Sequence, residues 1–363
     1  MHLSHLSLKN FRSYSELELP LNKGITVLLG RNGEGKTNVV EAILYTAFLT
    51  SHRTAGDQPL VRLGESSAYV RAKVQHPERE ILVELEINSD KANRARINQN
   101  PVRSQKELFG LVLSIYFSPE DMDLVRGDPS ERRRFIDQLI TLRSPRLAGV
   151  ISDYERAVRQ RNSLLKTRAS AASLEAWDQQ VAKFGAEIIA ARIALLDEFT
   201  PVFTKVYAGI SPEKPATILY KASIPTASST VTENFEQIIT KMAEIRGQEL
   251  DRGLTLVGPH RDDLLLHLGD HLVKGYASHG ESWSIALSLK LAAYELLINE
   301  GAQPILILDD VFSELDEGRR DQLVQLAQSA EQTIITVAVE SDLPKELSGD
   351  VYVVKNGSVK LLS

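Results

Sequence analysis

The sequence has no cysteine, only two tryptophans and three methionines among its 363 residues. Without cysteine the chain forms no disulfide and offers no thiolate to a metal, which fits a reducing compartment. No apolar run approaches the roughly 20 residues that span a bilayer, and the N-terminus lacks the apolar segment of a signal peptide. We therefore expect a cytoplasmic protein without a membrane partner. Because the formal net charge is −6, any surface for nucleic acid must be a local one.

One short stretch, 30-GRNGEGKTN-38, fits the pattern G-x-x-x-x-G-K-[ST] of loops that hold nucleotide phosphates. An apolar run at 25–29 precedes it and apolar residues at helical spacing follow it, which is the strand, loop and helix context that a phosphate loop requires. Lys36 would reach the β- and γ-phosphates, and the Thr37 hydroxyl would ligate Mg²⁺. We therefore predict a bound nucleoside triphosphate with Mg²⁺ at this loop. The expected nucleotide contacts are Gly30, Arg31, Asn32, Gly33, Glu34, Gly35, Lys36, Thr37 and Asn38.

Two adjacent acids, Asp309 and Asp310, end an apolar strand expected at 304–310. Acids at an exposed strand end often serve solubility alone, but phosphoryl chemistry requires a metal-holding acid in such a place. With a phosphate loop elsewhere in the chain, we expect Asp309 to hold Mg²⁺ through water. Asp310 would orient or deprotonate the attacking water.

A third polar segment, 278-SHGES-282, stands immediately before an apolar helical pattern that begins at Trp283. Ser278 and the backbone of Gly280 at a helix N-terminus would make a second anion site. A polar N-cap is the simpler explanation when this segment is taken alone.

The pattern of the sequence changes twice along the chain. We expect an α/β head built from both chain ends, residues 1–125 and 253–363, interrupted by a mainly helical insertion at 126–252. Alternating patterns predict antiparallel strands at 68–74 and 81–87 in the head. The remaining expected elements are helices through 130–207 with breaks at 144–145 and 168–173, a strand at 217–222, a helix at 231–250, a strand at 332–339, and hairpin turns at 98–101 and at Asn356-Gly357.

A basic tract lies within the insertion, from Arg126 to Arg168, where basic residues outnumber acids by roughly two to one, enough for a stripe that binds DNA phosphates. A solvated helical surface is the alternative. Few aromatic residues interleave the arginines, which favours contact with the backbone of duplex DNA over stacking on a single strand. The DNA-binding candidates are Arg132, Arg133, Arg143, Arg156, Arg159 and Arg161. Arg132 to Arg134 are consecutive, so they cannot all point one way.

Taken together, the phosphate loop, the S-x-G-E segment and the Asp-Asp strand followed by 313-SELD-316 resemble the ATP-binding cassette ATPases. Within them the chain is similar to the branch whose heads are split by an insertion, alongside SMC-type proteins. It resembles most closely the RecF family of bacterial recombinational repair. The segments that carry this resemblance are 10-NFRSY-14, 30-GRNGEGKTN-38, 51-SHRT-54, 117-FSPEDMDLVRGDPSERRRFID-137, 258-GPHRDDL-264, 278-SHGE-281, 287-LSLKLA-292 and 306-LILDDVFSELD-316.

The resemblance implies an enzyme, a slow DNA-dependent ATPase that hydrolyses ATP to ADP and phosphate. It implies an ATP-dependent homodimer on duplex or gapped DNA, which assists RecA loading with RecO and RecR. The nucleotide would be sandwiched between two heads, with Lys36, Asp310 and Ser278 as catalytic residues. Arg12 and Ser13 would also touch the nucleotide. The signature acting in trans would be Ser278, His279, Gly280 and Glu281.

The chain departs from the cassette pattern at several positions. Glu281 stands where glutamine is frequent, and Asp310 stands where transporters place glutamate, which favours slow hydrolysis. No histidine follows the strand at 332–339, where Thr336 is the nearest polar residue, and 118-SPED-121 occupies the place of the usual Q-loop. Two other functions stay open: the head of an SMC-like structural DNA clamp, and the ATPase subunit of a transporter.

Overall fold

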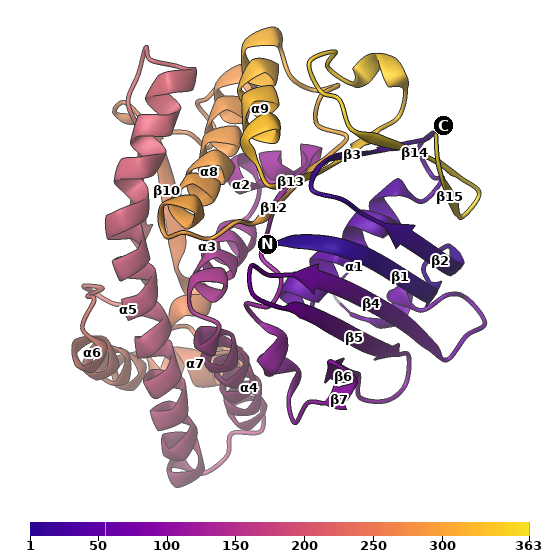
Figure 1. The fold of residues 1–363 in the computed structure, drawn as a ribbon. Coiled ribbons are helices and arrows are strands. Elements are labelled where there is room, and N and C mark those ends of the chain that lie inside the picture. The colour runs from indigo at the N-terminus through magenta and orange to yellow at the C-terminus, as the bar shows by residue number, and fades with distance from the viewer. Residues whose placement is uncertain (55, 363) are drawn as a thin grey trace. The chain divides into compact units, whose positions relative to one another are not determined.

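The computed structural model describes residues 1–54 and 56–362. The chain divides into two compact units, and Figure 1 labels many of their elements. The head unit contains Met1–Asp121 and Ala293–Ser363, and the arm unit contains Met122–Ala292. None of the described helices is long and apolar enough to cross a membrane.

The first sheet of the head unit is antiparallel, in the order β2-β1-β4-β5-β6-β7. Its strands are β1 (His2–Phe11), β2 (Tyr14–Pro20), β4 (Ser67–Gln75), β5 (Glu80–Asn88), β6 (Arg94–Ile97) and β7 (Asn100–Pro101). Buried residues alternate along β4 and β5, which pair in antiparallel register, so both expected strands are confirmed. The expected turn is also present, because Asn98 and Gln99 have φ of 50° and 67° between β6 and β7.

The second sheet of the head unit is mixed, in the order β15-β14-β3-β13-β12-β8. Its strands are β3 (Gly24–Leu29), β8 (Ser114–Phe117), β12 (Ile305–Asp309), β13 (Gln332–Val337), β14 (Asp350–Lys355) and β15 (Ser358–Leu361). Every residue of β12 and β13 is buried, as the apolar runs predicted. β3, β13 and β12 are parallel neighbours, so their carboxyl ends, and the residues that follow them, share one edge of the sheet.

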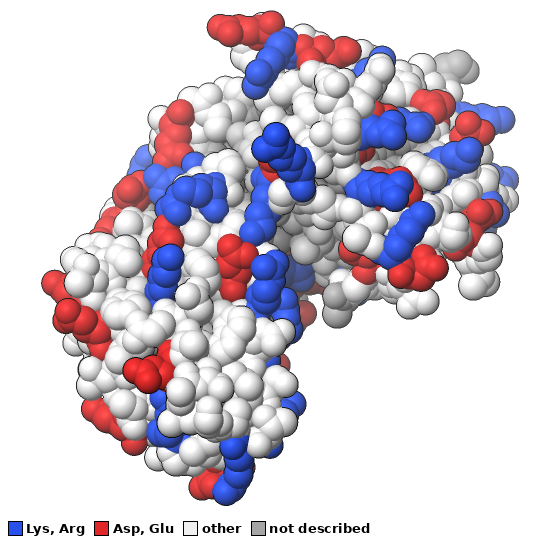
Figure 2. Space-filling model, turned by 90° about the horizontal axis from the view of Figure 1, so that it is seen from below, with Lys and Arg blue, Asp and Glu red and all other residues white. Residues whose placement is uncertain are grey.

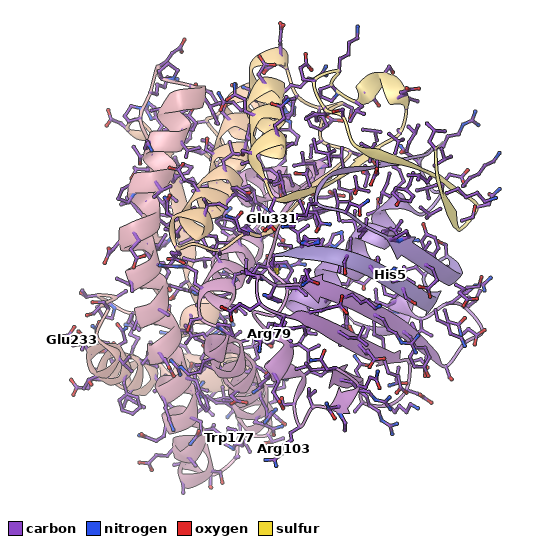
Figure 3. The ribbon with its side chains drawn as sticks, in the orientation of Figure 1. His5, Arg79, Arg103, Trp177, Glu233 and Glu331 are labelled. Atoms are coloured by element: carbon purple, nitrogen blue, oxygen red, sulfur yellow. The ribbon has the colours of Figure 1, made fainter. Side chains whose placement is uncertain are left out.

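Helices α1 (Lys36–Phe48) and α9 (Glu317–Ser329) complete the head unit. The two chain ends are tied together at the start of β1. The N-terminal ammonium of Met1 donates to Glu331 Oε2 at 2.6 Å, and Figure 3 labels Glu331. The side chain of Gln332 accepts from the Leu3 amide and donates to the Leu3 carbonyl, both at 2.8 Å. These bonds support the prediction that one head is built from both ends of the sequence.

The arm unit is mainly helical. Its helices are α2 (Met122–Arg126), α3 (Pro129–Arg143), α4 (Arg146–Lys166), α5 (Ala171–Ile210), α6 (Val231–Glu244) and α7 (Arg246–Arg252), and α8 (His279–Asn299) begins in it. Both expected breaks are present, and α4 packs along α5 (Figure 1). The helix expected at 231–250 is interrupted at Ile245. Short 3-10 turns occupy Gln58–Leu60, Gln105–Leu108, Pro119–Asp121, Pro259–Arg261 and Glu340–Asp342 along the chain.

The arm unit ends at Ala292 and not at residue 252, where the sequence predicted the end of the helical insertion. The arm unit has its own sheet, β11-β10-β9, formed by β9 (Ala216–Lys221), β10 (Asp263–Leu268) and β11 (His271–Leu272). β9 and β10 pair in antiparallel register from Lys221 opposite Asp263 to Ala216 opposite Leu268. Because β10 comes after residue 252, this pairing places the segment that leads to α8 in the arm unit.

Candidate nucleotide site and signature segment

The phosphate loop connects β3 to α1, the arrangement that the sequence predicted. Gly33 and Gly35 have φ of 85° and 113°, a region that side chains rarely adopt. A Cβ at Gly35 would lie 2.9 Å from the Tyr14 hydroxyl oxygen, and one at Gly30 would lie 2.4 Å from the Val354 carbonyl oxygen. The Tyr14 hydroxyl donates to the Gly35 carbonyl at 3.1 Å. Glycine is therefore required in this loop by backbone conformation and by close packing.

Lys36, the first residue of α1, turns its side chain back across the loop. Its Nζ donates to the Gly30 carbonyl at 2.7 Å and to Asn32 Oδ1 at 3.4 Å. The same nitrogen lies 3.6 Å from Asp310 Oδ2, and the Lys36 side chain is only 3% exposed. Two residues separated by more than 270 positions, both predicted to be catalytic, are thus brought into one ion pair.

Asp310 follows β12 with a φ of 51°, which is uncommon for a residue other than glycine. Such backbone conformations gather at functional sites. Its Oδ1 is buried and has no hydrogen-bond partner among the described residues. A cleft of about 410 Å³ opens beside it, lined by Asn32, Pro119, Asp310, Phe312, Ser313, Glu314, Val337, Ala338 and Asp342. Pro119 belongs to the segment 118-SPED-121, which the sequence analysis placed where a Q-loop is usual.

Asp309, the last residue of β12, is 5% exposed. Its Oδ1 accepts from the Thr336 hydroxyl at 2.5 Å, and its Oδ2 accepts from the Tyr116 hydroxyl at 3.1 Å. Burial, reinforced by the charge of Asp310, raises the pKa of Asp309 to about 6 against the opposing effect of these two hydrogen bonds. A cation beside this carboxylate would favour its charged form.

Thr336 links the two acids. Its hydroxyl also accepts from the Asp310 amide at 3.0 Å, while its carbonyl accepts from the same amide at 3.2 Å. The sequence offered Thr336 only as the nearest polar residue to the missing histidine. Tyr116 on β8 was not predicted at all; an aromatic residue two positions before 118-SPED-121 carries no signal of this contact.

The residues present fit a magnesium ion. No group of three or more His, Cys, Asp or Glu side chains that could hold a metal occurs in residues 1–54 and 56–362. Mg²⁺ is usually bound through one or two carboxylates together with water and substrate phosphates, so it needs no such group. Asp309 and the half-buried Thr37 offer the hard oxygen ligands that this mode uses.

Glu41, on the helix α1 that follows the phosphate loop, is the centre of a cluster of polar side chains that sequence reasoning missed. It is fully buried, and Arg12 donates to it twice, from Nε at 2.7 Å and from Nη2 at 2.6 Å. Ser51 donates at 2.5 Å and Arg53 lies at 3.7 Å. Burial alone would raise the pKa of Glu41, but the bonds from Arg12 and Ser51 outweigh it and lower the pKa. An acid at a buried position of an apolar helix was the only signal in the sequence.

Arg12, an expected nucleotide contact, is held within the head unit. Its third nitrogen, Nη1, donates to the Pro59 carbonyl at 2.8 Å. A guanidinium has five N–H groups and these bonds use one from each nitrogen, so the contact of Arg12 with the nucleotide stays a prediction. Ser13 lies beside the loop, where its Oγ accepts from Asn38 Nδ2 at 2.9 Å.

Among the other residues of the phosphate loop, Glu34 makes a hydrogen bond to a distant segment and three residues are exposed. Glu34 Oε2 accepts from the Asn356 amide at 2.5 Å, which joins the loop to the β14–β15 hairpin. Arg31, Asn32 and Gly33 are exposed.

The signature segment lies in the arm unit and forms a reciprocal cap at the start of α8. The Ser278 amide donates to Glu281 Oε2 at 2.9 Å, and the Glu281 amide donates to Ser278 Oγ at 3.2 Å. This is the polar N-cap that the sequence offered as the simpler explanation. The bond uses a lone pair of the serine oxygen, so the hydroxyl hydrogen can still be donated to an anion.

Two basic side chains of the arm unit contact this segment. Arg126 Nε donates to Ser282 Oγ at 3.2 Å, and its Nη1 lies 3.5 Å from His279 Nδ1. Lys214 Nζ donates to Glu281 Oε1 at 2.9 Å. Lys214 stands more than 60 positions away along the chain, so nothing in the local sequence pointed to it.

The basic tract is only partly available for DNA. Arg132 is 5% exposed and donates to both carboxylate oxygens of Asp263, at 2.7 and 3.0 Å. Arg161 is fully buried and donates to Asp178 at 2.6 Å and to Glu249 at 2.5 Å. The expectation that these two arginines contact DNA is therefore wrong, because their charges are enclosed and paired within the fold.

The other DNA candidates are nearer to solvent. Arg133 donates to the Asp262 carbonyl at 2.8 Å, and Arg143 pairs with Glu198 at 2.5 Å. Arg156 and Arg159 are exposed and lie 3.8 Å from Asp153 and Glu155. Figure 2 shows Lys and Arg side chains mixed with Asp and Glu over the face in view.

Comparisons with known proteins show the family of the chain. The family model described as RecF/RecN/SMC N terminal domain matches residues 2–358. The DNA replication and repair protein RecF of Streptomyces avermitilis is 50% identical over 371 residues, covering 99% of this chain and all of the relative. The protein of the same description from Frankia alni is 47% identical over 374 residues, covering 99% of each.

Solved structures show the same likeness. The structure of the recombination mediator protein RecF-ATPrS in RecFOR pathway superposes with a TM-score of 0.92 at 28% identity, covering 100% of this chain and 98% of that one. The corresponding RecF-ATP structure gives a TM-score of 0.91 at 28% identity with the same coverage. The SmcHead bound to the C-winged helix domain of ScpA gives 0.59 at 16% identity, covering 100% and 97%, which is a likeness of fold alone.

Proposed function

Because this chain belongs to the RecF family of DNA replication and repair proteins, we propose that it is a DNA-binding ATPase that acts as a recombination mediator. ATP binding closes two copies of the chain over duplex or gapped DNA, and hydrolysis of ATP to ADP and phosphate releases them. The relatives described as RecF-ATP and RecF-ATPrS in RecFOR pathway support ATP as the ligand. The pathway name in these descriptions, RecFOR, supports the proposal of RecO and RecR as partners. RecA as the protein that they help to load remains part of the proposal.

The single observation that carries this proposal is the grouping of Lys36, Asp309 and Asp310. The ammonium of Lys36 lies 3.6 Å from Asp310 at the edge of the sheet where β3 and β12 end. A phosphate that enters the loop meets that ammonium, the backbone amides of the loop and the positive end of α1. Asp310, whose Oδ1 has no partner among the described residues, then lies on the same side as the γ-phosphate.

The chemistry requires little beyond positioning and charge. When ATP binds, the Lys36 ammonium pairs with the β- and γ-phosphates instead of with Asp310. The Asp310 carboxylate can then accept a hydrogen bond from water. Asp310 orients this water for in-line attack on the γ-phosphorus, and the ADP oxygen leaves on the opposite side. Thr37 and, through water, Asp309 would hold Mg²⁺, which would neutralise phosphate charge. Aspartate is shorter than glutamate, so hydrolysis is expected to be slow.

Closure of two copies completes the site. Ser278 of one copy donates its hydroxyl hydrogen to the γ-phosphate that the loop of the other copy holds. His279 and the amide of Gly280 stand beside it at the positive end of α8. ATP thereby becomes part of the interface, so its binding and dimerisation are coupled.

The proposed DNA surface is smaller than the sequence suggested. Arg133, Arg143, Arg156 and Arg159 remain in it, and Arg132 and Arg161 do not. Phosphate contacts made by arginines give an affinity that falls steeply with salt and depends little on sequence.

The decisive experiment measures the mass of the protein in solution, with and without ATP and Mg²⁺, and with duplex, gapped or single-stranded DNA. We expect a monomer without ATP and a dimer with ATP, retained on duplex or gapped DNA. A protein that stays monomeric at saturating ATP would contradict the proposal. ATP-independent retention on DNA would instead favour a structural clamp, and lack of DNA binding would favour the transporter class.

A further inference from the structure

Glu281 occupies an unusual place for an acid. It is the third residue after the Ser278 cap, at the end of α8 that the proposed function turns toward a triphosphate. Its carboxylate accepts from the Ser278 amide at 2.9 Å and is 28% exposed. The hydrogen bonds from the Ser278 amide and from Lys214 hold the pKa of Glu281 at about 2, so it is ionised at neutral pH.

An ionised carboxylate in this place weakens the site it caps. The N-terminus of a helix attracts anions through its partial positive charge, which is about half a unit charge. A full negative charge within one turn of Ser278 more than cancels that attraction. Repulsion between a carboxylate and a doubly charged phosphate at about 6 Å in water costs on the order of a tenfold change in an equilibrium constant.

Lys214 lies where its ammonium neutralises the negative charge of Glu281. It stands in the short connection between α5 and β9, and its Nζ donates to the Glu281 oxygen Oε1 at 2.9 Å. The other carboxylate oxygen, Oε2, is the one that caps the Ser278 amide. One ion pair therefore leaves the cap intact and neutralises the acid beside it.

We propose that Lys214 is a positioning residue for the signature segment. By neutralising Glu281 it allows the Ser278 end of α8 to receive the γ-phosphate of ATP held by a second copy of the chain. This inference rests on the proposed function, since it assigns a residue to the same interface.

The pair is too exposed to matter much for the fold. The side chains of Lys214 and Glu281 are 57% and 28% exposed, and ion pairs at such positions contribute little to stability. Loss of Lys214 is therefore expected to leave the protein folded, and its effect is confined to binding of the triphosphate across the interface.

The test compares Lys214→Met, Glu281→Gln and the double variant. Lys221→Met is the matched control, because Lys221 is another exposed lysine of the same unit. ATP affinity of the monomer and the ATP-dependent dimerisation constant are measured by titration at low and high salt. We expect unchanged ATP affinity of the monomer in every variant. Dimerisation of Lys214→Met should weaken on the order of tenfold at low salt, with a smaller defect at high salt.

The double variant distinguishes the explanations. Glutamine keeps an oxygen that can accept from the Ser278 amide, so the cap survives while both charges are gone. We therefore expect the double variant to dimerise within about twofold of wild type, a rescue that a merely structural role of Lys214 would not produce. Glu281→Gln alone leaves the charge of Lys214 unpaired and should dimerise at least as tightly as wild type.

Three outcomes overturn the inference. If Lys214→Met dimerises as well as wild type, Lys214 has no role at the interface. If the double variant is as defective as Lys214→Met, the lysine acts by some means other than neutralising Glu281. If wild type does not dimerise with ATP, the proposed function fails and the inference fails with it, so the wild-type control separates the two.

Discussion

The hydroxyl of Thr336 joins the two acids of the nucleotide site, because it donates to Asp309 Oδ1 at 2.5 Å and accepts from the Asp310 amide at 3.0 Å. Thr336 lies on β13, and the acids lie at the end of its parallel neighbour β12. A single side chain thus sets the orientation of the proposed metal-holding carboxylate and the backbone of the proposed water-positioning residue.

Thr336→Val removes the hydrogen bond to Asp309 while keeping the shape of the side chain. The pKa of Asp309 then rises further above about 6, so less of it is ionised at neutral pH and Mg²⁺ is held less well. We expect several-fold more Mg²⁺ for half-maximal ATP hydrolysis at pH 6.5, and a smaller difference at pH 8.5. A bond to a charged group is worth about 1.5–3 kcal/mol, which sets the scale of the effect.

Thr333→Val is the matched control for this prediction. Thr333 is buried on the same strand, but its hydroxyl donates to the Ala327 carbonyl at 3.0 Å, away from the acids. Its Mg²⁺ requirement should equal that of wild type. An equal Mg²⁺ requirement in Thr336→Val and wild type at both pH values would show that Thr336 does not act on the metal.

Asp309 also makes the stability of the protein depend on pH. A carboxyl with a pKa of about 6 in the folded state and 3.8 as its ordinary value binds more protons folded than unfolded between these limits. Its cost to stability is therefore absent below about pH 3.8, grows as the pH rises, and is complete above about pH 6. Asp309→Asn should stabilise the protein on the order of 3 kcal/mol at pH 7.5 and much less at pH 4.5.

Urea unfolding of wild type and Asp309→Asn across pH 4.5 to 8 measures this difference. Asp90→Asn, at an exposed acid of the same unit, is the matched control. A difference between wild type and Asp309→Asn that shrinks as the pH rises would reverse the sign and refute the burial argument.

Asp310→Asn tests the assignment of the water-positioning acid. Asparagine keeps the size of the side chain but is a poorer acceptor for the attacking water, and it no longer pairs with Lys36. We expect ATP binding at least as tight as in wild type and hydrolysis reduced by 10²-fold or more, a magnitude typical for loss of a positioned base. The protein should then accumulate as an ATP-bound dimer, which sizing would detect; Lys36→Arg should behave alike. Hydrolysis of Asp310→Asn at the wild-type rate would remove Asp310 from the mechanism.

The sequence predicted the site where its signals are local and failed where they are not. The phosphate loop, the Asp-Asp strand and the cap at Ser278 each depend on a few consecutive residues, and all three have the expected local structure. Glu41 and Lys214 matter through partners that lie far away in sequence, and no spacing rule reveals such pairs. The second unit boundary was misplaced for the same reason, because only the pairing of β9 with β10 shows that residues 253–292 pack with the arm unit.

The basic tract shows this limit most clearly. Arg159 and Arg161 look alike in the sequence, yet one is exposed and the other is enclosed by Asp178, Glu249 and Thr255. Arg161→Met leaves two buried acids with reduced compensation and should destabilise the arm unit by about 3–5 kcal/mol. Arg159→Met should change stability by less than about 0.5 kcal/mol and instead weaken duplex binding with a shallower salt dependence.

Chemical unfolding and DNA titration of the two variants, run side by side, measure these opposite effects. The prediction fails if Arg161→Met unfolds like wild type while losing DNA affinity, since a buried and paired arginine cannot reach a phosphate.

The last prediction concerns the proposed interface between copies. Ser278→Arg leaves the loop, Lys36 and Thr37 untouched, so the monomer should bind ATP with nearly unchanged affinity. The large, positively charged side chain at the start of α8 should prevent two copies from closing on each other, so dimerisation and hydrolysis should fall together. If the variant loses ATP affinity as a monomer, Ser278 acts on the nucleotide of its own chain and the shared site is wrong.

Mixing two inactive variants makes the test sharper. Lys36→Met should abolish ATP binding, because the charge on the β- and γ-phosphates is lost, but it keeps a normal signature segment. In a mixed dimer with Ser278→Arg, one site combines the normal loop of one copy with the normal Ser278 of the other, and the second site carries both changes. Hydrolysis should therefore reappear on mixing, up to about half of the wild-type rate per mixed dimer if the two sites act independently. Each variant alone, at the same total concentration, is the control, and a mixture no more active than the sum of its parts would show that the serine and the loop of different copies do not form one site.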